Sequence, residues 1–427
     1  MQTFGLSKPG VGVKIVILNY AYHITGGPER YLFNIKAMLE AKGHVVIPYS
    51  VQSPKNVESP YEAEFLPQVG NGEFNYQNFG KSGIGDKIKR VTRLVYSVEA
   101  KKHFKKFLQK YKPDLVYVLY YQNKISCSVI NAAKELNIPV VQRISDFSLI
   151  CPNASFYDYK SGNICEKCLH GSVCHAIKQK CVHGSAALSG LKSLAIKVQN
   201  LCKIKEKIDA FVFPSSYTMS KFIAAGYDEN KLYHIPTPFN KGLLNDIPVS
   251  YGNFALYVGR LDSTKGLETL VRAFLENKKP LKIIGDSKNG YKEYLEKIVE
   301  GKEHNIEFLG WLEFNDIQKY LSTCLFTLIP SEWYDNLPNT LLESYALKKC
   351  VVATDLGSLA ENVQDKKTGL LFKYRDISDL AEKANKLFDD VELAKQLGEN
   401  AYSRIDEVYS ANVHYDKLMR VFEEVVK

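Results

Sequence analysis

Two acidic residues flank the expected start of a helix in the segment 330–343. Asp335 precedes Pro338, a residue suited to the first helical position because its missing N–H costs nothing there. The free backbone N–H groups at a helix start attract anions. Glu343 lies roughly 7.5 Å further along the helix axis. This spacing fits two carboxylates that grip hydroxyl groups on either side of a phosphate. It fits a solvated helix start with an ordinary surface glutamate equally well.

A second segment supplies positive charge. Arg260 and Lys265 follow the apolar run 254–258, which is typical of a buried strand. Ligands of open α/β sheets bind at the carboxyl ends of strands, where an arginine fork and a lysine point charge can neutralise a diphosphate. Two isolated basic loop residues are more often simply solvated. Glycines at the ends of two further strands let the backbone approach a ligand, or only form turns: Gly285 and Gly357.

Four cysteines between residues 151 and 181 have the spacing of a metal site, with a central Cys-x-x-Cys: Cys151, Cys165, Cys168 and Cys181. Four thiolates form a closed tetrahedral site for structural zinc. Free thiols or a redox pair explain the same spacing, and both alternatives stay open at this point.

The elements that must position these residues alternate between strand and helix. The β-branched run 14–19, a helix over 29–41 and a second apolar run at 44–48 predict a strand–helix–strand unit with a parallel sheet. Further strands are expected at 114–118, 139–142 and 209–213. Two prolines mark 234–240 as a linker. The pattern then restarts, with strands at 254–259, 281–285, 306–309, 325–329 and 350–353, and a last helix over 412–426. The sequence therefore predicts two doubly wound α/β domains.

The motifs, in this order, resemble those of glycosyltransferase family 4. Segments 259–266 and 335–343 are similar to its diphosphate-binding motif and to its Glu-x(7)-Glu motif, with Asp335 replacing the first glutamate. Segments 357–361 and 368–371 resemble its closing segments, and Gly26 and Gly27 resemble its N-terminal glycine loop. A subset of that family carries a similar Cys-Pro-Asn and Cys-x-x-Cys insert.

The resemblance implies the GT-B fold, in which two Rossmann-like domains face each other and a C-terminal helix crosses back to the first. The domains would be an acceptor-side domain over 1–235, joined by the helix at about 410–427, and a donor-binding domain over 236–409. It also implies a retaining transfer of a sugar from a nucleotide diphosphate donor to a saccharide or lipid-linked acceptor. The expected role is surface polysaccharide synthesis.

The same resemblance assigns roles to individual residues. Glu343 would hold the ribose hydroxyls, and Asp335 with the N–H groups near Asn336 and Leu337 would hold the donor sugar. Donor contacts are also expected at Gly26, Gly27 and Gly285. Catalytic roles are expected for four residues: Arg260, Lys265, Asp335 and Asp146. Ser145, just before Asp146, stands where the family often has histidine. No cofactor is expected for the chemistry, since basic residues replace a divalent cation at the diphosphate and no Asp-x-Asp motif occurs.

Composition narrows the location. With 427 residues, 45% hydrophobic and 24% charged, the chain has the profile of a soluble globular protein. The first ten residues lack an apolar signal core, no apolar stretch reaches a membrane span, and nine cysteines favour a reducing compartment. We therefore expect a cytoplasmic protein, either free or peripheral on the inner face of the cell membrane.

Charge is uneven, at +14 for residues 1–250 and −5 for the remainder. The basic run from Lys81 to Lys112, with apolar residues at helical spacing, predicts a helix that binds an anionic membrane surface. A helix packed on the core with solvated charges is at least as consistent. Nucleic acid is not an expected partner. Three rival functions remain: a glycogen- or sucrose-type enzyme, a nucleotide-sugar epimerase or hydrolase, and a basic zinc-bearing nucleic-acid-binding protein.

Overall fold

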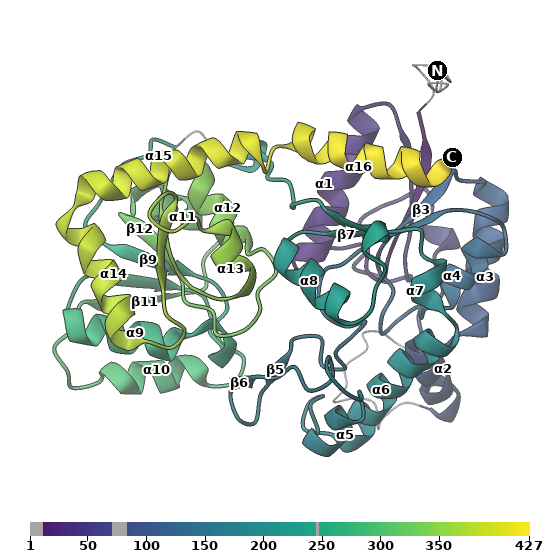
Figure 1. Cartoon of the computed structure of the whole chain (residues 1–427), viewed down its shortest axis with the longest axis horizontal. Coiled ribbons are helices and arrows are strands. Elements are labelled where there is room, and N and C mark those ends of the chain that lie inside the picture. The colour runs from purple at the N-terminus through teal and green to yellow at the C-terminus, as the bar shows by residue number, and fades with distance from the viewer. Residues whose placement is uncertain (1–11, 71–82, 245–246) are drawn as a thin grey trace.

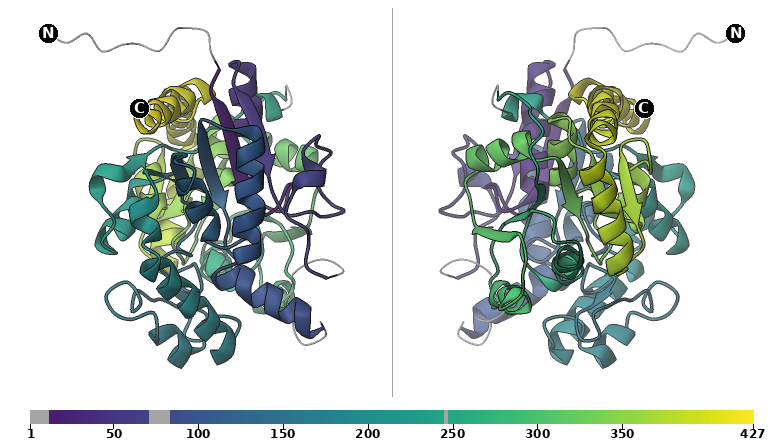
Figure 2. Two further views of the ribbon diagram at one scale, coloured as in Figure 1. Left: turned by 90° about the vertical axis from the view of Figure 1, so that its right-hand side faces the viewer. Right: turned by 90° about the vertical axis from the view of Figure 1, so that its left-hand side faces the viewer.

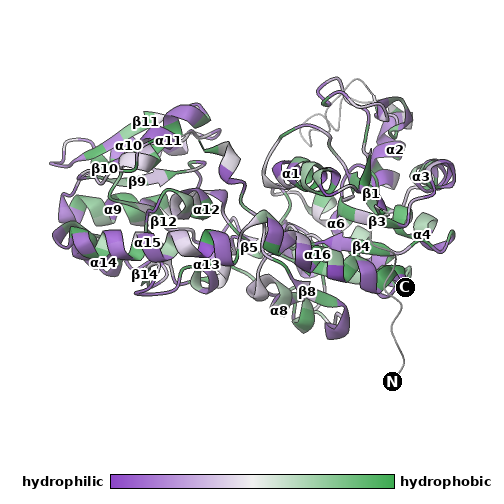
Figure 3. Ribbon diagram, turned by 90° about the horizontal axis from the view of Figure 1, so that it is seen from above, coloured by the Kyte–Doolittle hydropathy of each residue, from purple (hydrophilic) through white to green (hydrophobic). Residues whose placement is uncertain are grey.

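The computed structural model describes residues 12–70, 83–244 and 247–427. They form two α/β halves, each built on one parallel six-stranded sheet (Figure 1). The predicted fold class is therefore confirmed. Hydrophobic residues concentrate in the strands of both halves, as the hydropathy colours of Figure 3 show.

The first sheet has the strand order β2-β1-β3-β4-β7-β8. Residues Ile15 to Leu18 of its strand β1 are no more than 1% exposed, as expected for a strand covered by helices on both faces. The strands are β1 (Lys14–Asn19), β2 (Val45–Tyr49), β3 (Leu115–Tyr120), β4 (Val140–Arg143), β7 (Ala210–Phe213) and β8 (Leu232–His234). The accompanying helices are α1 (Gly27–Ala41), α2 (Ile84–Val95), α3 (Val98–Tyr111), α4 (Ser128–Lys134), α6 (Ala186–Leu201), α7 (Ile204–Lys207) and α8 (Ser216–Ala224).

The second sheet repeats the design in the order β11-β10-β9-β12-β13-β14. Its strands are β9 (Ala255–Val258), β10 (Leu281–Ile284), β11 (Ile306–Gly310), β12 (Phe326–Ile329), β13 (Val351–Thr354) and β14 (Gly369–Phe372). Its helices are α9 (Leu267–Asn277), α10 (Tyr291–Val299), α11 (Phe314–Thr323), α12 (Asn339–Ala346), α13 (Gly357–Asn362), α14 (Ile377–Asp389) and α15 (Val391–Glu407).

The last helix, α16 (Ala411–Val426), follows α15 but packs on the first sheet (Figures 1 and 2). Its buried residues Leu418, Val421 and Phe422 belong to the same apolar cluster as Ile15 and Ile17 of β1. Burial of these side chains from water holds the end of the chain against the first half.

Between β4 and α6 lies an insert with little regular structure, residues 151–181, which we call the cysteine insert. It holds a two-stranded antiparallel ribbon, β5 (Tyr157–Asp158) and β6 (Asn163–Ile164), and a short helix, α5 (His175–Gln179). The ribbon lies between the two halves in Figure 1.

Several local predictions need correction. Helix α1 begins at Gly27, two residues before the expected start. The basic run forms two helices, because the chain is extended at Tyr96 and a new helix is capped by Ser97. Pro338 is the N-cap of α12 rather than its first residue. Strand β8 extends into the expected linker and ends at His234. Lys81 lies outside the described residues, as do the first ten residues.

None of the helices in the described part of the chain has the length and apolar composition that crossing a membrane requires.

Candidate active site

An ion pair lies at the carboxyl-terminal edge of the second sheet. Lys265 ends a short 3₁₀ turn (Ser263–Lys265) after β9, and Asp335 lies in the loop after β12. The Lys265 ammonium donates to both carboxylate oxygens of Asp335, at 2.8 and 2.7 Å. The Ser331 hydroxyl donates to the same carboxylate. The structure therefore brings together two of the residues that the sequence assigned to catalysis, and in this state they neutralise each other.

Glu343 lies on α12, one helix turn beyond the N-cap, and is 8% exposed. Burial raises the pKa of its carboxyl above the ordinary value, and the charge of Arg30 opposes that shift. The Arg30 guanidinium is 3.9 Å away and belongs to α1 of the first half. A carboxylate of the second half therefore lies beside the first turn of α1 in the first half, and its oxygens can accept hydrogen bonds from hydroxyl groups.

The predicted glycines have different surroundings. A side chain at Gly285, where φ is +144°, would overlap the carbonyl oxygen of Gly259. Gly285 is therefore required by the packing of two loops, whereas the sequence suggested approach of a ligand. Apart from its chain neighbours and the backbone of its own helix, no atom of the described residues lies within 4 Å of the position that a Cβ would take on Gly27. Gly26 has only Glu29 and Pro28 at contact distance beyond its chain neighbours, so the glycine loop leaves open space around Gly27.

Arg260 is the most exposed of the expected catalytic residues. Its side chain is 71% exposed and lies 3.4 Å from the Asp262 carboxylate. It lies at the carboxyl end of β9, and no contact within the described residues holds it over Lys265.

Asn336 and Leu337 follow Asp335. The Asn336 amide joins the halves: it donates to the Ser145 carbonyl at 3.1 Å and accepts from the Thr218 hydroxyl at 2.9 Å. Leu337 packs against the apolar cluster around Leu341. The side chain of Asn336 therefore fastens the Asp335 loop to the loop that carries Asp146.

Asp146 follows β4 in the first half. It accepts hydrogen bonds from the Tyr120 hydroxyl at 2.9 Å and from the Ser148 backbone N–H at 2.8 Å. Burial raises the pKa of Asp146, and these hydrogen bonds oppose the shift. Lys192 of α6 also acts on Asp146, and desolvation lowers the pKa of that lysine to about 8. Sequence reasoning missed Tyr120 and Lys192, since neither lies in a motif.

A second missed group connects the cysteine insert to the second half. Arg375 pairs with Glu332 and donates to the Gly162 carbonyl and, at 2.9 Å, to the Asn163 side chain. The Tyr334 hydroxyl, next to Asp335, donates to Glu166 of the insert at 2.7 Å. Glu332 lies inside the segment 330–343, and this position was its only signal in the sequence. Tyr334 was expected to help shape the sugar pocket, but its contact with the insert was not predicted.

All four cysteines of the expected metal site line one small cavity, together with Gln179. Burial raises the pKa of Cys151, Cys168 and Cys181 to about 11, which favours the protonated thiols. Within the described ranges, no group of three or more His, Cys, Asp or Glu side chains is arranged to hold a metal ion. The donors are thus of the right kind and converge on one space, but as oriented here they do not form a metal site.

The basic run lies on α2 and α3. Lys101 and Lys105, on α3, both pair with Glu135, so part of the positive charge of the basic run is already compensated. Ile84 and Ile88 of α2 are 80% and 59% exposed and leave an apolar strip beside the lysines of that helix.

Comparison with known proteins identifies the second half. Residues 249–404 match the model of the family described as glycosyl transferases group 1, so this half carries a domain of that family. An uncharacterized glycosyltransferase of Methanocaldococcus jannaschii is 34% identical over 184 residues, which are 43% of this chain and 52% of that protein. A capsular polysaccharide biosynthesis glycosyltransferase of Staphylococcus aureus is 26% identical over 54% of this chain and 59% of its own length. The matches thus span about half the length of these curated relatives.

Two solved structures match nearly the whole chain. Sucrose-phosphate synthase from Thermosynechococcus elongatus has a TM-score of 0.67 at 18% identity and covers 96% of this chain and 98% of its own. An Anabaena protein solved in complex with UDP has a TM-score of 0.64 at 16% identity, with 96% and 100% covered. At these identities the likeness shows the fold, which is the GT-B arrangement of glycosyltransferases.

Proposed function

We propose that this protein is a retaining glycosyltransferase that moves a sugar from a nucleotide diphosphate donor, held by the second half, to an acceptor held by the first. The observation that carries the proposal is the Lys265–Asp335 pair at the same sheet edge as the buried Glu343, which faces Arg30 of the other half. A structural neighbour solved with UDP, and relatives named as glycosyltransferases, support it.

In this mechanism Lys265 exchanges its partner when the donor binds. Its ammonium moves from Asp335 to the diphosphate, and the released Asp335 carboxylate accepts a hydrogen bond from a hydroxyl of the donor sugar. Glu343 accepts hydrogen bonds from the ribose hydroxyls. Arg260, exposed and close to the same loop, adds a second positive charge to the diphosphate. This arrangement favours cleavage because negative charge grows on the leaving group as the bond from C1 to the diphosphate oxygen breaks.

The acceptor completes the step. Its hydroxyl oxygen bonds to C1 on the face that the diphosphate leaves, which retains the configuration, and its proton passes to the departing diphosphate oxygen. Asp146, held by Tyr120 and Ser148, lies on the first half where it can orient the donor sugar or the acceptor hydroxyl.

The proposed role is the synthesis of a surface polysaccharide or a lipid-linked oligosaccharide. It rests on relatives such as the Staphylococcus aureus capsular enzyme. The sucrose-phosphate synthase likeness keeps a soluble-sugar enzyme as a rival, and an epimerase or hydrolase would use the same donor site.

The test is a thermal-shift panel of UDP-, GDP-, ADP- and dTDP-sugars, followed by product analysis. A donor at 100 times its Kd stabilises the folded protein by about 2.7 kcal/mol. NMR of the product then separates transfer with retention from hydrolysis, epimerisation and inversion. Failure of every nucleotide sugar to stabilise the protein would contradict the proposal.

We also propose that the first half docks on an anionic membrane surface, which would bring a lipid-linked acceptor to the enzyme. Because Lys101 and Lys105 are paired with Glu135, the apolar strip Ile84 and Ile88 of α2 with Lys87 and Lys89 is the better candidate for contact. Each basic residue near such a surface adds about 1 kcal/mol. Binding to anionic vesicles should fall with salt and with the Lys87→Gln/Lys89→Gln variant, and equal binding to neutral vesicles would contradict docking.

A further inference from the structure

Tyr334 of the second half is surrounded by side chains of the first half and of its cysteine insert. Its hydroxyl donates to the Glu166 carboxylate at 2.7 Å, and its ring centre lies 5.0 Å from that of Tyr217 and 6.2 Å from that of Phe147. The Lys221 ammonium pairs with Glu166 at 2.7 Å and lies 5.3 Å from the centre of the Tyr334 ring. We call these five residues the Tyr334 cluster. It joins the loop after β12 to the insert, to α8 and to the loop after β4.

Glu166 is charged in this cluster, although only 21% of its side chain is exposed. Burial disfavours the charged form, but the hydrogen bonds from Lys221 and Tyr334 outweigh burial and lower the pKa of Glu166 below its ordinary value. Burial raises the pKa of Tyr334 to about 12, so its hydroxyl stays protonated and can donate. Hydrogen bonds to an ionised acceptor are stronger than those between neutral groups. Glu166 therefore holds the Tyr334 hydroxyl firmly.

The Tyr334 cluster lies next to two of the expected catalytic residues. Tyr334 directly precedes Asp335, and Phe147 directly follows Asp146. Tyr334 and Asp335 belong to neither a helix nor a strand, so side-chain contacts decide where their loop lies. Asn336 makes one such contact with the first half, and Tyr334 makes the others described here. The position of Asp335 relative to the first half is therefore set on both sides of it.

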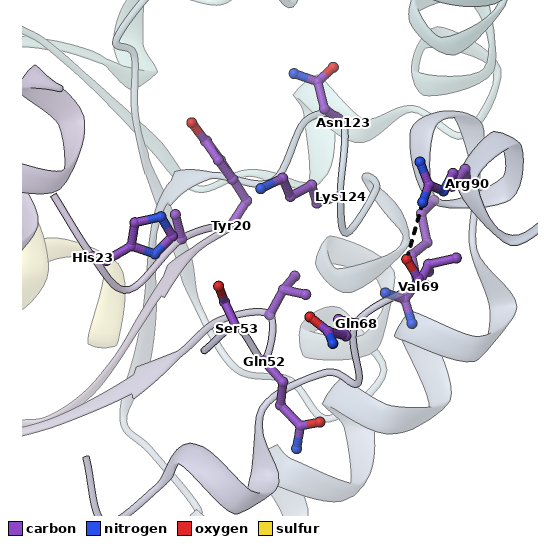
Figure 4. A pocket seen from close by; sticks show the side chains of 12 residues that line it. Tyr20, His23, Gln52, Ser53, Gln68, Val69, Arg90, Asn123 and Lys124 are labelled. Atoms are coloured by element: carbon purple, nitrogen blue, oxygen red, sulfur yellow. Dashed lines mark hydrogen bonds between the residues drawn. The ribbon is translucent and has the colours of Figure 1, made fainter. Parts of the chain in front are cut away.

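The Tyr334 cluster is separate from the pocket of the first half that Figure 4 shows. The described lining of that pocket contains none of the five residues of the cluster. Its wall includes Tyr20, whose ring packs edge-on against Tyr120, and Tyr120 donates to Asp146. Gln52, labelled in Figure 4, also lines the pocket. A variant at Gln52 therefore alters the first half without altering the cluster.

We propose that Glu166 is a positioning residue for sugar transfer. Through Tyr334, it fixes the place of Asp335 relative to the first half. The inference rests on the proposed function, because it takes Asp335 to accept a hydrogen bond from the donor sugar. Loss of the Glu166 carboxylate should therefore disturb the hold on the sugar, whereas Glu343 still holds the ribose.

Binding of two ligands tests this inference: the nucleotide sugar that stabilises the wild type most in the thermal-shift panel, and the nucleoside diphosphate with the same base. Isothermal titration of the full-length protein gives both affinities. In Glu166→Ala and in Tyr334→Phe, the affinity for the nucleotide sugar should fall about tenfold, the scale of a lost hydrogen bond to a charged group. The affinity for the nucleoside diphosphate should stay the same, because neither variant changes a residue proposed to hold the nucleotide. A general loosening of the fold would weaken both ligands.

The double variant Glu166→Ala/Tyr334→Phe assigns the effect to the bond between the two side chains. Tyr334→Phe removes only the hydroxyl and keeps the ring. If both residues act through their hydrogen bond, the double variant should lose no more affinity than the weaker-binding single variant. Glu166→Gln keeps an oxygen that can accept from Tyr334, so it should recover part of the affinity that Glu166→Ala loses.

Two control variants should bind both ligands like the wild type. Glu135→Ala removes a carboxylate of the first half that also pairs with lysines, and Gln52→Ala alters the pocket wall. If Glu166→Ala fails to fold, Tyr334→Phe decides. Equal losses for the two ligands, additive losses in the double variant, or wild-type binding by Tyr334→Phe would overturn the inference. Each of these outcomes requires that the wild type bind the nucleotide sugar, so it is distinct from a failure of the proposed function.

Discussion

The candidate site is built in two different ways on its two sides. In the second half, Lys265, Asp335 and Glu343 follow strands of one regular parallel sheet or open one helix, so backbone hydrogen bonds fix where each side chain begins. On the first side, the residues that reach across come in part from the cysteine insert, which has only a short ribbon and a five-residue helix. Regular secondary structure therefore positions the wall of the site formed by the second half, which we call the second wall. Side-chain contacts must position much of the wall formed by the first half and its cysteine insert, which we call the first wall.

The less regular wall contacts the loop that carries Asp335. Tyr334 touches Phe147 and Phe156 and donates to Glu166 between two of the cysteines, so the insert bears directly on the loop that carries Asp335. A substitution that loosens the insert should therefore weaken donor binding, even though it changes no residue that is proposed to contact the donor. The following predictions probe each wall in turn.

The largest effect is expected at the cysteines. If Cys151, Cys165, Cys168 and Cys181 reorient to bind one zinc ion, protein purified without added metal should carry about one zinc per chain. Structural zinc contributes about 10–16 kcal/mol in small zinc peptides, so Cys168→Ser should lose the metal and several kcal/mol of stability. Elemental analysis and thermal unfolding measure both.

Cys174→Ser is the matched control, because Cys174 accepts from Lys197 and does not line the cavity. Absence of metal together with four freely titrating thiols would reject zinc. The first wall would then depend on hydrogen bonds and apolar packing alone.

Lys265→Ala tests the second wall. Removing one preorganised charge from a developing anion costs about 10²–10³ in turnover, or about 2.7–4 kcal/mol. The loss should be greater in turnover than in donor affinity, because the charge on the diphosphate is largest in the transition state. Single-turnover kinetics and nucleotide titration separate the two.

The surface pair Lys319–Asp316, also 2.8 Å long, supplies the control variant Lys319→Ala. In Lys265→Ala the Asp335 carboxylate is left beside the diphosphate, so adding Asp335→Asn should restore part of the donor affinity. Unchanged turnover in folded Lys265→Ala would remove Lys265 from the mechanism.

Sequence patterns predicted this second wall better than the first. Five of the six strands of the second sheet lie within one residue of the predicted apolar runs, because a strand buried on both faces needs a continuous apolar sequence. No strand was predicted at β14. The insert has no such period. Its contacts join residues far apart in the chain, such as Glu166 and Tyr334, and no local pattern encodes them. The ion pair between Lys265 and Asp335 was missed for the same reason, although both residues were named.

Glu343→Gln should weaken nucleotide diphosphate binding by about 1.5–3 kcal/mol, the scale of hydrogen bonds to a charged group. It should not destabilise the protein, because burial already raises the pKa of this carboxyl and so disfavours its charged form. Isothermal titration and thermal unfolding give the two quantities. Glu382→Gln, an exposed residue of α14, is the control, and equal affinities of wild type and Glu343→Gln would contradict the assignment.

The smallest effect concerns the helix that ties the chain end to the first half. His414 of α16 is buried, bonds to the Pro236 carbonyl at 2.7 Å and to the Tyr31 hydroxyl at 3.0 Å, and burial lowers its pKa to about 3. Between that value and about 6.5 the unfolded chain binds a proton that the folded protein does not, so stability falls as pH falls. From pH 7 to pH 5 this amounts to about 2 kcal/mol. Asp146 and Glu343, whose pKa values are raised, change stability in the opposite direction, so the effect is isolated by comparing wild type with His414→Gln. The wild type should lose about 2 kcal/mol more than the variant in urea unfolding at the two pH values. Equal losses would mean that His414 is protonated in the folded protein and that α16 is not held to the first sheet by a neutral imidazole.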